Sequence, residues 1–408
     1  MKLQTIKKAW EQFMVIPDPW IIDMILGTLI GNAIIDRGAV WVMITAKSSG
    51  GKTTLLKPIN LIKGIHFIDD LTEKTLLSGF KVKGKESSLL NIIGNGTIAF
   101  SDFTSIMSKN PVSRGEILGQ LRLVHDGEMK KSTGNSTLVW KGKIGFIGAS
   151  TNDVYFHLEQ GRSMGERFIF YCMNQPSDEE IANKQDGVSE SPQSIQDTMA
   201  PMYLDYSSSV REWVDKNGLP PLKLSKEQRE KVKQAVMFCV NGKATVHTNY
   251  KTGKADQMPN KAGVGRDLKM FDALLHAFQV MDCYEHDDIN HPLSNDRIKL
   301  IQKCAYSSLN RERRKILEIL ADEIEPIGAS QIGTRNNFGL EKEAVEMYLN
   351  PLNAVGIVKK TMVGNAFKWQ IQDPNIKNFI KDVQETMEQE IYDEQDPIIE
   401  TQSALDDF

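Results

Sequence analysis

A glycine-rich segment, AKSSGGKTT (46–54), follows the apolar run WVMITA (41–46) and precedes a second apolar stretch. Its spacing fits the loop that holds the phosphates of a nucleotide, with alanine in place of the first glycine. In such a loop backbone N–H groups surround the phosphates, Lys52 reaches the β and γ phosphates, and Thr53 ligates Mg²⁺. A Gly-Gly-Lys-Thr turn without function is the alternative. The residues expected to contact ATP here are Ala46, Ser49, Gly50, Gly51, Lys52, Thr53 and Thr54.

A site for Mg²⁺ and ATP also needs a carboxylate at the end of a neighbouring strand. The apolar run TIAFSD (97–102) ends in Asp102, about fifty residues after the loop. We expect Asp102 to bind the same Mg²⁺ as Thr53 and to contact the nucleotide.

The glutamate that usually follows such an aspartate, and polarises the attacking water, is absent. Phe103 occupies its position. Asp70 or Glu73, which follow the apolar run IHFID (65–69), could supply the base instead. An exposed acidic turn explains both residues equally well.

Apolar runs alternate with helical patterns up to residue 174. This alternation is typical of an α/β domain with a parallel sheet. Residues 1–36 are expected to be helical, 176–197 to form an exposed connection, and 198–308 to be mainly helical, with loops at 217–221 and 249–263. The expected strands are 41–46, 65–69, 97–102, 143–150 and 167–173.

Residues 309–372 have a different pattern, with three helical stretches followed by two alternating strands around Gly364-Asn365. This order describes a winged helix. Its third helix carries mostly glutamates, which disfavours reading of a DNA major groove. The hairpin, with Lys359, Lys360 and Lys368, is the better candidate for contacting DNA phosphates, unless this domain only packs on the rest of the protein or binds another protein.

Composition is that of a globular protein of two or three domains, with 408 residues, 40% hydrophobic and 25% charged. Disordered, collagen-like and disulfide-rich classes are excluded. No apolar run approaches the ~20 residues of a membrane helix, and no signal peptide is apparent, so a cytoplasmic protein is expected. The four cysteines are scattered, and the group of Cys283, His286 and His291 is better explained as a polar loop than as a metal site.

Charge is distributed unevenly along the chain. Residues 382–408 hold ten Asp and Glu and no Lys or Arg, so the remaining 43 acidic residues are outnumbered by the 49 basic ones. A mildly basic body is compatible with DNA binding. The segment 373–408 is expected to be an acidic tail, which after residue 382 is too acidic and too poor in apolar residues to fold.

Several cationic and polar residues lie between Asp102 and the helical region. A predicted hairpin around Gly134-Asn135 presents lysines, an apolar strand ends at Thr151 and Asn152, and two arginines occur in GRSMGERF. A further arginine begins a helical pattern in GRDLKMF. The cationic residues in question are Lys130, Lys131, Lys141, Lys143, Arg162, Arg167 and Arg266.

Taken together, these motifs and their order resemble the AAA+ ATPases of the minichromosome-maintenance-like branch, as found in helicases of phages and mobile elements. The similarity spans roughly residues 20–372. It implies that Thr151 or Asn152 orients water near the γ-phosphate, that Arg167 is a finger reaching the nucleotide of a neighbouring subunit, and that Arg266 is the sensor-2 residue. It also implies a homo-oligomeric ring, most simply a hexamer, with Lys130, Lys131 and Lys141 meeting single-stranded DNA in the channel.

The expected function is an ATP-driven DNA motor, most concretely a replicative helicase or translocase of a phage or mobile element, acting with replication proteins and away from membranes. A helicase loader or initiator is an alternative, as is a nucleotide-gated scaffold or defence sensor with little hydrolysis. The expected organisation is an N-terminal helical segment, an AAA+ core, a linker with a helical lid, a winged helix and a tail, at 1–36, 37–175, 176–308, 309–372 and 373–408.

Overall fold

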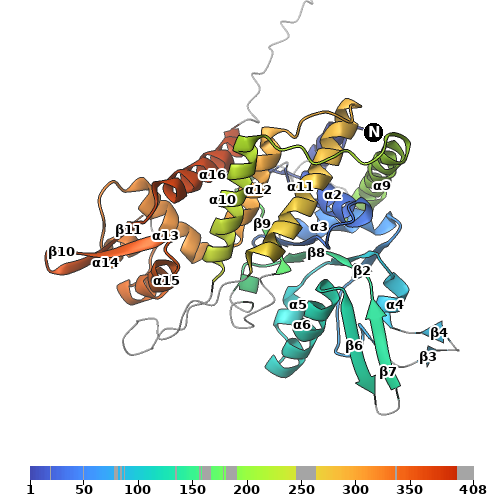
Figure 1. Ribbon diagram of the computed structural model, residues 1–408, viewed down its shortest axis with the longest axis horizontal. Coiled ribbons are helices and arrows are strands. Elements are labelled where there is room, and N and C mark those ends of the chain that lie inside the picture. The colour runs from blue at the N-terminus through green and yellow to red at the C-terminus, as the bar shows by residue number, and fades with distance from the viewer. Residues whose placement is uncertain are drawn as a thin grey trace, which may run out of the picture.

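A central parallel sheet with helices on both faces forms the middle of the molecule (Figure 1). This α/β architecture is the expected one. The computed structural model describes the whole chain except residues 19, 49, 78–80, 83–84, 87, 134–135, 156–157, 159–166, 178, 181–190, 245–262, 336–337 and 393–408.

All five expected strands are present in this sheet, and every neighbouring pair is parallel. Parallel strands that are buried on both faces consist of continuous apolar runs, and these runs made the strands predictable from the sequence. Their carboxyl ends meet at one edge, where the glycine-rich segment leaves the sheet. In spatial order the strands are β2 (Ile65–Ile68), β5 (Thr97–Phe100), β8 (Gly145–Ser150), β1 (Trp41–Thr45) and β9 (Ile169–Cys172).

Alternate residues of β1 enter two separate hydrophobic clusters, one on each face of the sheet. Val42 and Ile44 belong to the larger cluster, whereas Trp41 and Met43 belong to the smaller one. The smaller cluster is covered by short helices and a hairpin. These elements are α4 (Leu89–Ile93), α5 (Thr104–Met107), α6 (Pro111–His125), β6 (Glu128–Thr133) and β7 (Ser136–Lys141), with a small ribbon of β3 (Lys81–Val82) and β4 (Lys85–Glu86) nearby.

Long helices cover the other face. They are α1 (Leu3–Glu11), α2 (Trp20–Ile34), α9 (Pro192–Asn217), α10 (Lys226–Gly242), α11 (Val264–His286) and α12 (Asn295–Ser307). Helix α2 is apolar around nearly its whole circumference and packs on α11 so closely that a Cβ on Gly27 would lie 2.4 Å from Phe278. A fully buried ion pair joins Lys303 of α12 to Asp18, with 2.7 Å between Nζ and Oδ2.

The C-terminal part has the expected order of three helices and a hairpin. They are α13 (Arg311–Asp322), α14 (Ala329–Thr334), α15 (Lys342–Ala354), β10 (Val358–Val363) and β11 (Ala366–Ile371). The larger hydrophobic cluster continues from α1 into these elements, so the core does not mark the expected domain boundaries. Hairpins β6–β7 and β10–β11 project from well-separated parts of the molecule (Figure 1).

Two expectations about connections are wrong. Helix α9 begins at Pro192, inside the stretch expected to be a connection, because Ser191 caps its N-terminus. Helix α16 (Pro374–Tyr392) occupies the first half of the expected acidic tail. Its acidic composition concealed an apolar stripe, since Phe379, Ile380 and Val383 are buried against the preceding helices.

The loop at 217–221 is present after α9, whereas 249–262 and the chain from 393 onward lie outside the described residues. Among the described helices, none combines the length and the apolar character needed to cross a membrane.

Candidate functional site

The glycine-rich segment leaves the carboxyl end of β1 and turns into the short helix α3 (Lys52–Leu56), which continues as a 3₁₀ turn, η1 (Lys57–Leu61). Gly51 has φ of +76°, a left-handed conformation that favours glycine. A Cβ on Gly50 would lie 2.0 Å from the side chain of Gln175. The backbone conformation therefore favours glycine at position 51, whereas a side chain at position 50 would require the flexible end of Gln175 to move. The helix after the loop is short, because Pro58 lies in the 3₁₀ turn that follows.

Lys52 is buried, with only 8% of its surface exposed. Its ammonium donates to the carbonyls of Ala46 and Lys47, at 3.1 and 2.5 Å. Burial lowers the Lys52 pKa, while the charges of Asp102 and Cys172 oppose that shift. No carboxylate of the described residues forms an ion pair with it, so a desolvated positive charge sits beneath the loop where a phosphate would neutralise it. Ser49, between Ala46 and Gly50, lies outside the described residues.

Oxygen atoms suited to Mg²⁺ gather beside this loop. The Thr53 hydroxyl donates to the carbonyl of Ser101 at 3.2 Å, which brings it next to Asp102. Asp102 is exposed, and one carboxylate oxygen accepts from the Thr104 N–H at 2.9 Å. A hydroxyl and a carboxylate are ligands that Mg²⁺ prefers, so Thr53 and Asp102 fit the expected ion. Thr54, one residue farther along α3, is partly buried.

Phe103 is a core residue and does not face the loop. Its ring is completely buried and lies 5.7 Å from each of the rings of Phe100, Phe146 and Phe168. Its N–H donates to the carbonyl of Ala149 at 2.7 Å, which holds the backbone against β8. A glutamate at this position would enter the aromatic cluster, so the missing acid has a structural explanation.

Asp69 is the carboxylate that sequence reasoning missed. It follows β2 directly, and the Ser101 hydroxyl donates to it at 2.5 Å. The two suggested substitutes are engaged elsewhere. Asp70 pairs with Lys109 at 2.9 Å, and a hydrogen bond from Ser113 is the main cause that lowers the pKa of Glu73. The sequence feature that could have identified Asp69 is its position as the first residue after the apolar strand IHFI.

The end of β8 places Thr151 and Asn152 at the same edge. The Thr151 N–H donates to the Thr104 hydroxyl at 3.4 Å, which connects this segment to the turn that carries Asp102. The Asn152 side-chain oxygen is buried and has no hydrogen-bond partner within the described part of the chain. Three residues on, the buried Tyr155 hydroxyl donates to the carbonyl of Ser307 at 2.5 Å and contacts the Thr45 hydroxyl at 3.2 Å. Tyr155 thereby joins the strand before the loop to the end of α12.

Arg167 does not lie at this edge. It precedes β9, and since β9 is parallel to β1, Arg167 lies at the amino end of the sheet, opposite the loop. Its guanidinium is buried and pairs with Asp126, with contacts of 2.8 and 3.3 Å. Burial and an ion pair within the chain hold the side chain in this conformation, so the role of Arg167 as a finger that reaches a neighbouring subunit's nucleotide stays a prediction. Arg162 lies outside the described residues.

Arg266, in the first turn of α11, is close to His125 and to the pair of Arg167 and Asp126. Burial is the main cause that lowers the His125 pKa to about 4, and the charges of Arg167 and Arg266 add to it, while Asp126 opposes them. Arg266 thus contributes charge beside Arg167. Lys52, Thr53, Asp102, Thr151 and Asn152 share the carboxyl edge of the sheet, and the two arginines form a separate group.

The lowered His125 pKa predicts a pH dependence of stability. Because the folded protein binds the proton more weakly than the unfolded chain does, stability is complete above pH 6.5 and falls as the pH drops toward 4. The loss from this residue is expected to be about 3 kcal/mol at most. Urea unfolding of wild type and His125→Asn between these pH values measures it. If the free energy of unfolding fell equally with decreasing pH in the two proteins, His125 would not be the cause of the loss.

Hairpin β6–β7 displays two of its three lysines. Lys130 and Lys141 are exposed, and each pairs with Glu128, at 2.9 and 3.5 Å. Lys131 instead donates to the carbonyls of Glu73 and Leu77, both at 3.1 Å, so its ammonium is held by the chain in this conformation and its expected contact with DNA stays a prediction. Lys143 also points inward, toward the end of α2. The tip, Gly134-Asn135, lies outside the described residues.

Comparison with known proteins adds no assignment. No protein-family model matches the chain, and no curated protein sequence matches it.

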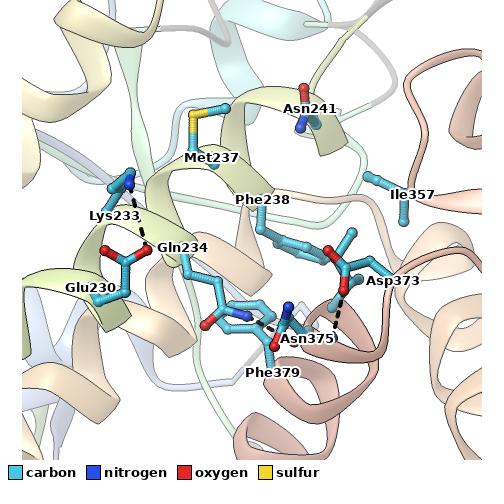
Figure 2. Close-up of a pocket in the computed structure, with 11 residues that line it drawn as sticks. Glu230, Lys233, Gln234, Met237, Phe238, Asn241, Ile357, Asp373, Asn375 and Phe379 are labelled. Carbon is cyan, nitrogen blue, oxygen red and sulfur yellow. Dashed lines mark hydrogen bonds and ion pairs between the residues drawn. The ribbon is translucent and has the colours of Figure 1, made fainter. Parts of the chain in front are cut away.

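A pocket of about 390 Å³ lies between α10 and the start of α16, away from the glycine-rich loop (Figure 2). The Gln234 amide donates to the carbonyl of Asn375 across it at 2.7 Å. The rings of Phe238 and Phe379, 4.7 Å apart, are buried at its floor. No residue of the loop lines it, so it is a crevice between helices and not the nucleotide site. Its remaining lining residues are Glu230, Lys233, Met237, Asn241, Ile357, Asp373 and Ile376.

The two histidines near Cys283 do not form a metal site. Their rings stack 3.6 Å apart and nearly parallel. Within the described ranges no group of three His, Cys, Asp or Glu side chains could hold a metal ion. The Cys283 thiol contacts the carbonyls of Ile289 and His291 instead, at 3.6 Å.

Proposed function

We propose that this chain is an ATPase of the AAA+ type that uses ATP to act on DNA. The observation that carries the proposal is the buried ammonium of Lys52 beneath a glycine loop, beside Thr53 and Asp102. Ligands of open parallel sheets bind at the carboxyl ends of the strands, where these residues lie. The order of sheet, helices α9–α12, three further helices and a hairpin supports an AAA+ core with a helical lid and a winged helix.

In this proposal ATP binds with its phosphates in the loop. Lys52 stabilises charge on the β and γ phosphates, and Thr53 and Asp102 hold the Mg²⁺. An Mg²⁺ held by Thr53 and Asp102 would neutralise charge that develops on the phosphates. Asn152 has a free side-chain oxygen, and so can orient the attacking water from the end of β8.

Asp69 is our candidate for the carboxylate that accepts a proton from this water. The Ser101 hydroxyl, which donates to Asp69, lies next to this carboxylate. Asp69→Asn is expected to lower kcat by about 10² or more while ATP binding is retained, since general bases contribute about 10² to 10⁴. Asp70→Asn is the matched control, because it loses only the exposed pair with Lys109. Single-turnover hydrolysis measures both variants. Similar rates in the two would remove Asp69 from the mechanism.

Assembly into a ring, most simply a hexamer, is part of the proposal because the motifs resemble those of AAA+ ATPases. A neighbouring subunit's nucleotide can be reached by Arg167 only if its pair with Asp126 opens. Contact with DNA through hairpin β6–β7 depends on Lys130 and Lys141, which are exposed. In the most concrete form of the proposal, the protein is a replicative helicase or translocase of a phage or mobile element.

The deciding experiment measures ATP hydrolysis by the purified protein with and without single-stranded DNA, together with its mass in solution with nucleotide. Turnover stimulated by DNA in an assembled oligomer supports the motor. A tight ATP complex with negligible turnover at any DNA concentration would contradict it.

A helicase loader or nucleotide-gated scaffold is the second candidate, and one observation favours it. The residue after Asp102 is locked in the core, so the usual catalytic glutamate has no counterpart at that position. Such a protein would assemble on DNA with ATP and turn it over slowly. Strand displacement by the protein alone would exclude this alternative.

A further inference from the structure

Hairpin β10–β11 has an apolar face that is buried at its base and exposed toward its tip. Across the two strands Lys360 faces Trp369, and Met362 faces Phe367. Trp369 is completely buried, whereas Phe367 is 50% and Met362 59% exposed. The apolar surface therefore extends past the core into solvent, on an element that projects from the molecule (Figure 1).

One lysine, Lys360, lies on the same face as this exposed surface, and two more lysines lie on the opposite face of the hairpin. The hairpin carries Lys359, Lys360 and Lys368 and no acidic residue. The Lys360 ammonium lies 4.4 Å from the centre of the Phe367 ring and 4.8 Å from that of Trp369. No ion pair joins these lysines to a carboxylate within the part of the chain that the structure describes. The charges are thus available to an anionic partner.

We propose that the tip of β10–β11 binds single-stranded DNA by stacking a base on Phe367 while Lys360, on the same face, contacts a neighbouring phosphate. Lys359 and Lys368, on the opposite face, attract the strand as it passes around the hairpin. Aromatic rings beside cations are the usual means of holding single strands without sequence preference. A duplex offers phosphates but no unstacked base, so the exposed Phe367 and Met362 would gain nothing from it. This inference rests on the proposed function for its partner, DNA, but not on ATP hydrolysis.

The rest of this unit argues against binding in a major groove. Helix α15 carries Glu341, Glu343 and Glu346 at and near its N-terminus, with only Lys342 to oppose them. Phosphates would be repelled from that end of the helix. The hairpin is therefore the cationic element that DNA can approach.

The test measures binding of a fluorescein-labelled oligo(dT) and of a labelled duplex by fluorescence anisotropy, with the full chain and without nucleotide. Phe367→Ala is expected to weaken oligo(dT) binding at least about fivefold, the lower bound for one stacked base, and to leave duplex binding unchanged. Phe367→Tyr should bind like wild type. The double change Lys359→Ala and Lys368→Ala should reduce the salt dependence of oligo(dT) binding. The slope of log affinity against log salt concentration should become shallower by about 0.7 for each phosphate that the protein no longer neutralises.

Met347→Ala is the matched control, because Met347 is 60% exposed but belongs to α15. All variants are also made in a protein that carries Lys130→Ala and Lys141→Ala. DNA binding by hairpin β6–β7 then cannot conceal a loss of binding at the tip of β10–β11. Unchanged oligo(dT) binding by Phe367→Ala in that background would overturn the inference, as would an equal loss for oligo(dT) and duplex. Repeating the assay with Lys52→Ala separates the two proposals, since stacking persists when ATP hydrolysis is absent.

Discussion

The Lys52→Ala variant is expected to lose ATP hydrolysis by about 10² to 10³ or more, the usual effect of removing one group that stabilises developing charge. Within the part of the chain that the structure describes, the buried ammonium of Lys52 bonds to carbonyl oxygens alone. A bound phosphate is the anion that would balance it. ATP affinity should fall as well, because the attraction acts on the ground state and on the transition state. Titration with a fluorescent ATP analogue and steady-state hydrolysis measure the two effects.

The stability of this variant provides an independent check. Burial disfavours the charged ammonium, so replacing it should leave the free energy of unfolding unchanged or raise it. Lys57→Ala is the matched control, since Lys57 is exposed in the turn that follows α3. Hydrolysis at the wild-type rate by Lys52→Ala would reject the nucleotide site itself. A loss of activity that accompanies unfolding would show only that Lys52 supports the fold.

The Phe103→Glu variant is expected to lose more than about 4 kcal/mol of stability. Removing a buried phenylalanine ring costs about 3 to 5 kcal/mol, and a carboxylate without a partner adds a desolvation penalty. Phe103 lies among Phe100, Phe146 and Phe168, in the smaller hydrophobic cluster. Restoring the usual glutamate should therefore disrupt the core and not restore a catalytic base. Urea unfolding and ATP hydrolysis together measure the outcome.

Phe103→Leu keeps this prediction testable if the glutamate variant does not fold. Leucine preserves an apolar side chain but removes the ring–ring interactions, so a smaller loss of about 1 to 2 kcal/mol is expected, with hydrolysis unchanged. A folded Phe103→Glu protein that hydrolyses ATP faster than wild type would contradict the structural role of Phe103. It would also place this side chain at the nucleotide.

Much of the local structure was predictable because it depends on residues that are near one another in the chain. The five parallel strands appear as apolar runs, and both hairpins follow from alternating patterns around Gly-Asn pairs. The three helices before β10 were also found. Helix α16 was missed because its acidic residues outweighed an apolar stripe whose meaning depends on the helices that it packs against.

The site was predictable only in part, for the same reason. The order Lys52, Asp102, Asn152 follows strand ends, and parallel strands bring such ends to one edge of a sheet. The state of an individual side chain follows from contacts between distant segments. Lys131 bonds to carbonyls more than fifty residues away, and Arg167 pairs with Asp126 forty-one residues away.

The sequence by itself thus determined the strands, the glycine loop and the position of Asp102, since periodicity and loop spacing act over a few residues. The tertiary structure alone decided which charges are exposed and which carboxylate joins the site. It placed Phe103 in the core and bonded Asp69 to Ser101. The physical reason is that burial and hydrogen bonding depend on neighbours in space, which local sequence does not specify.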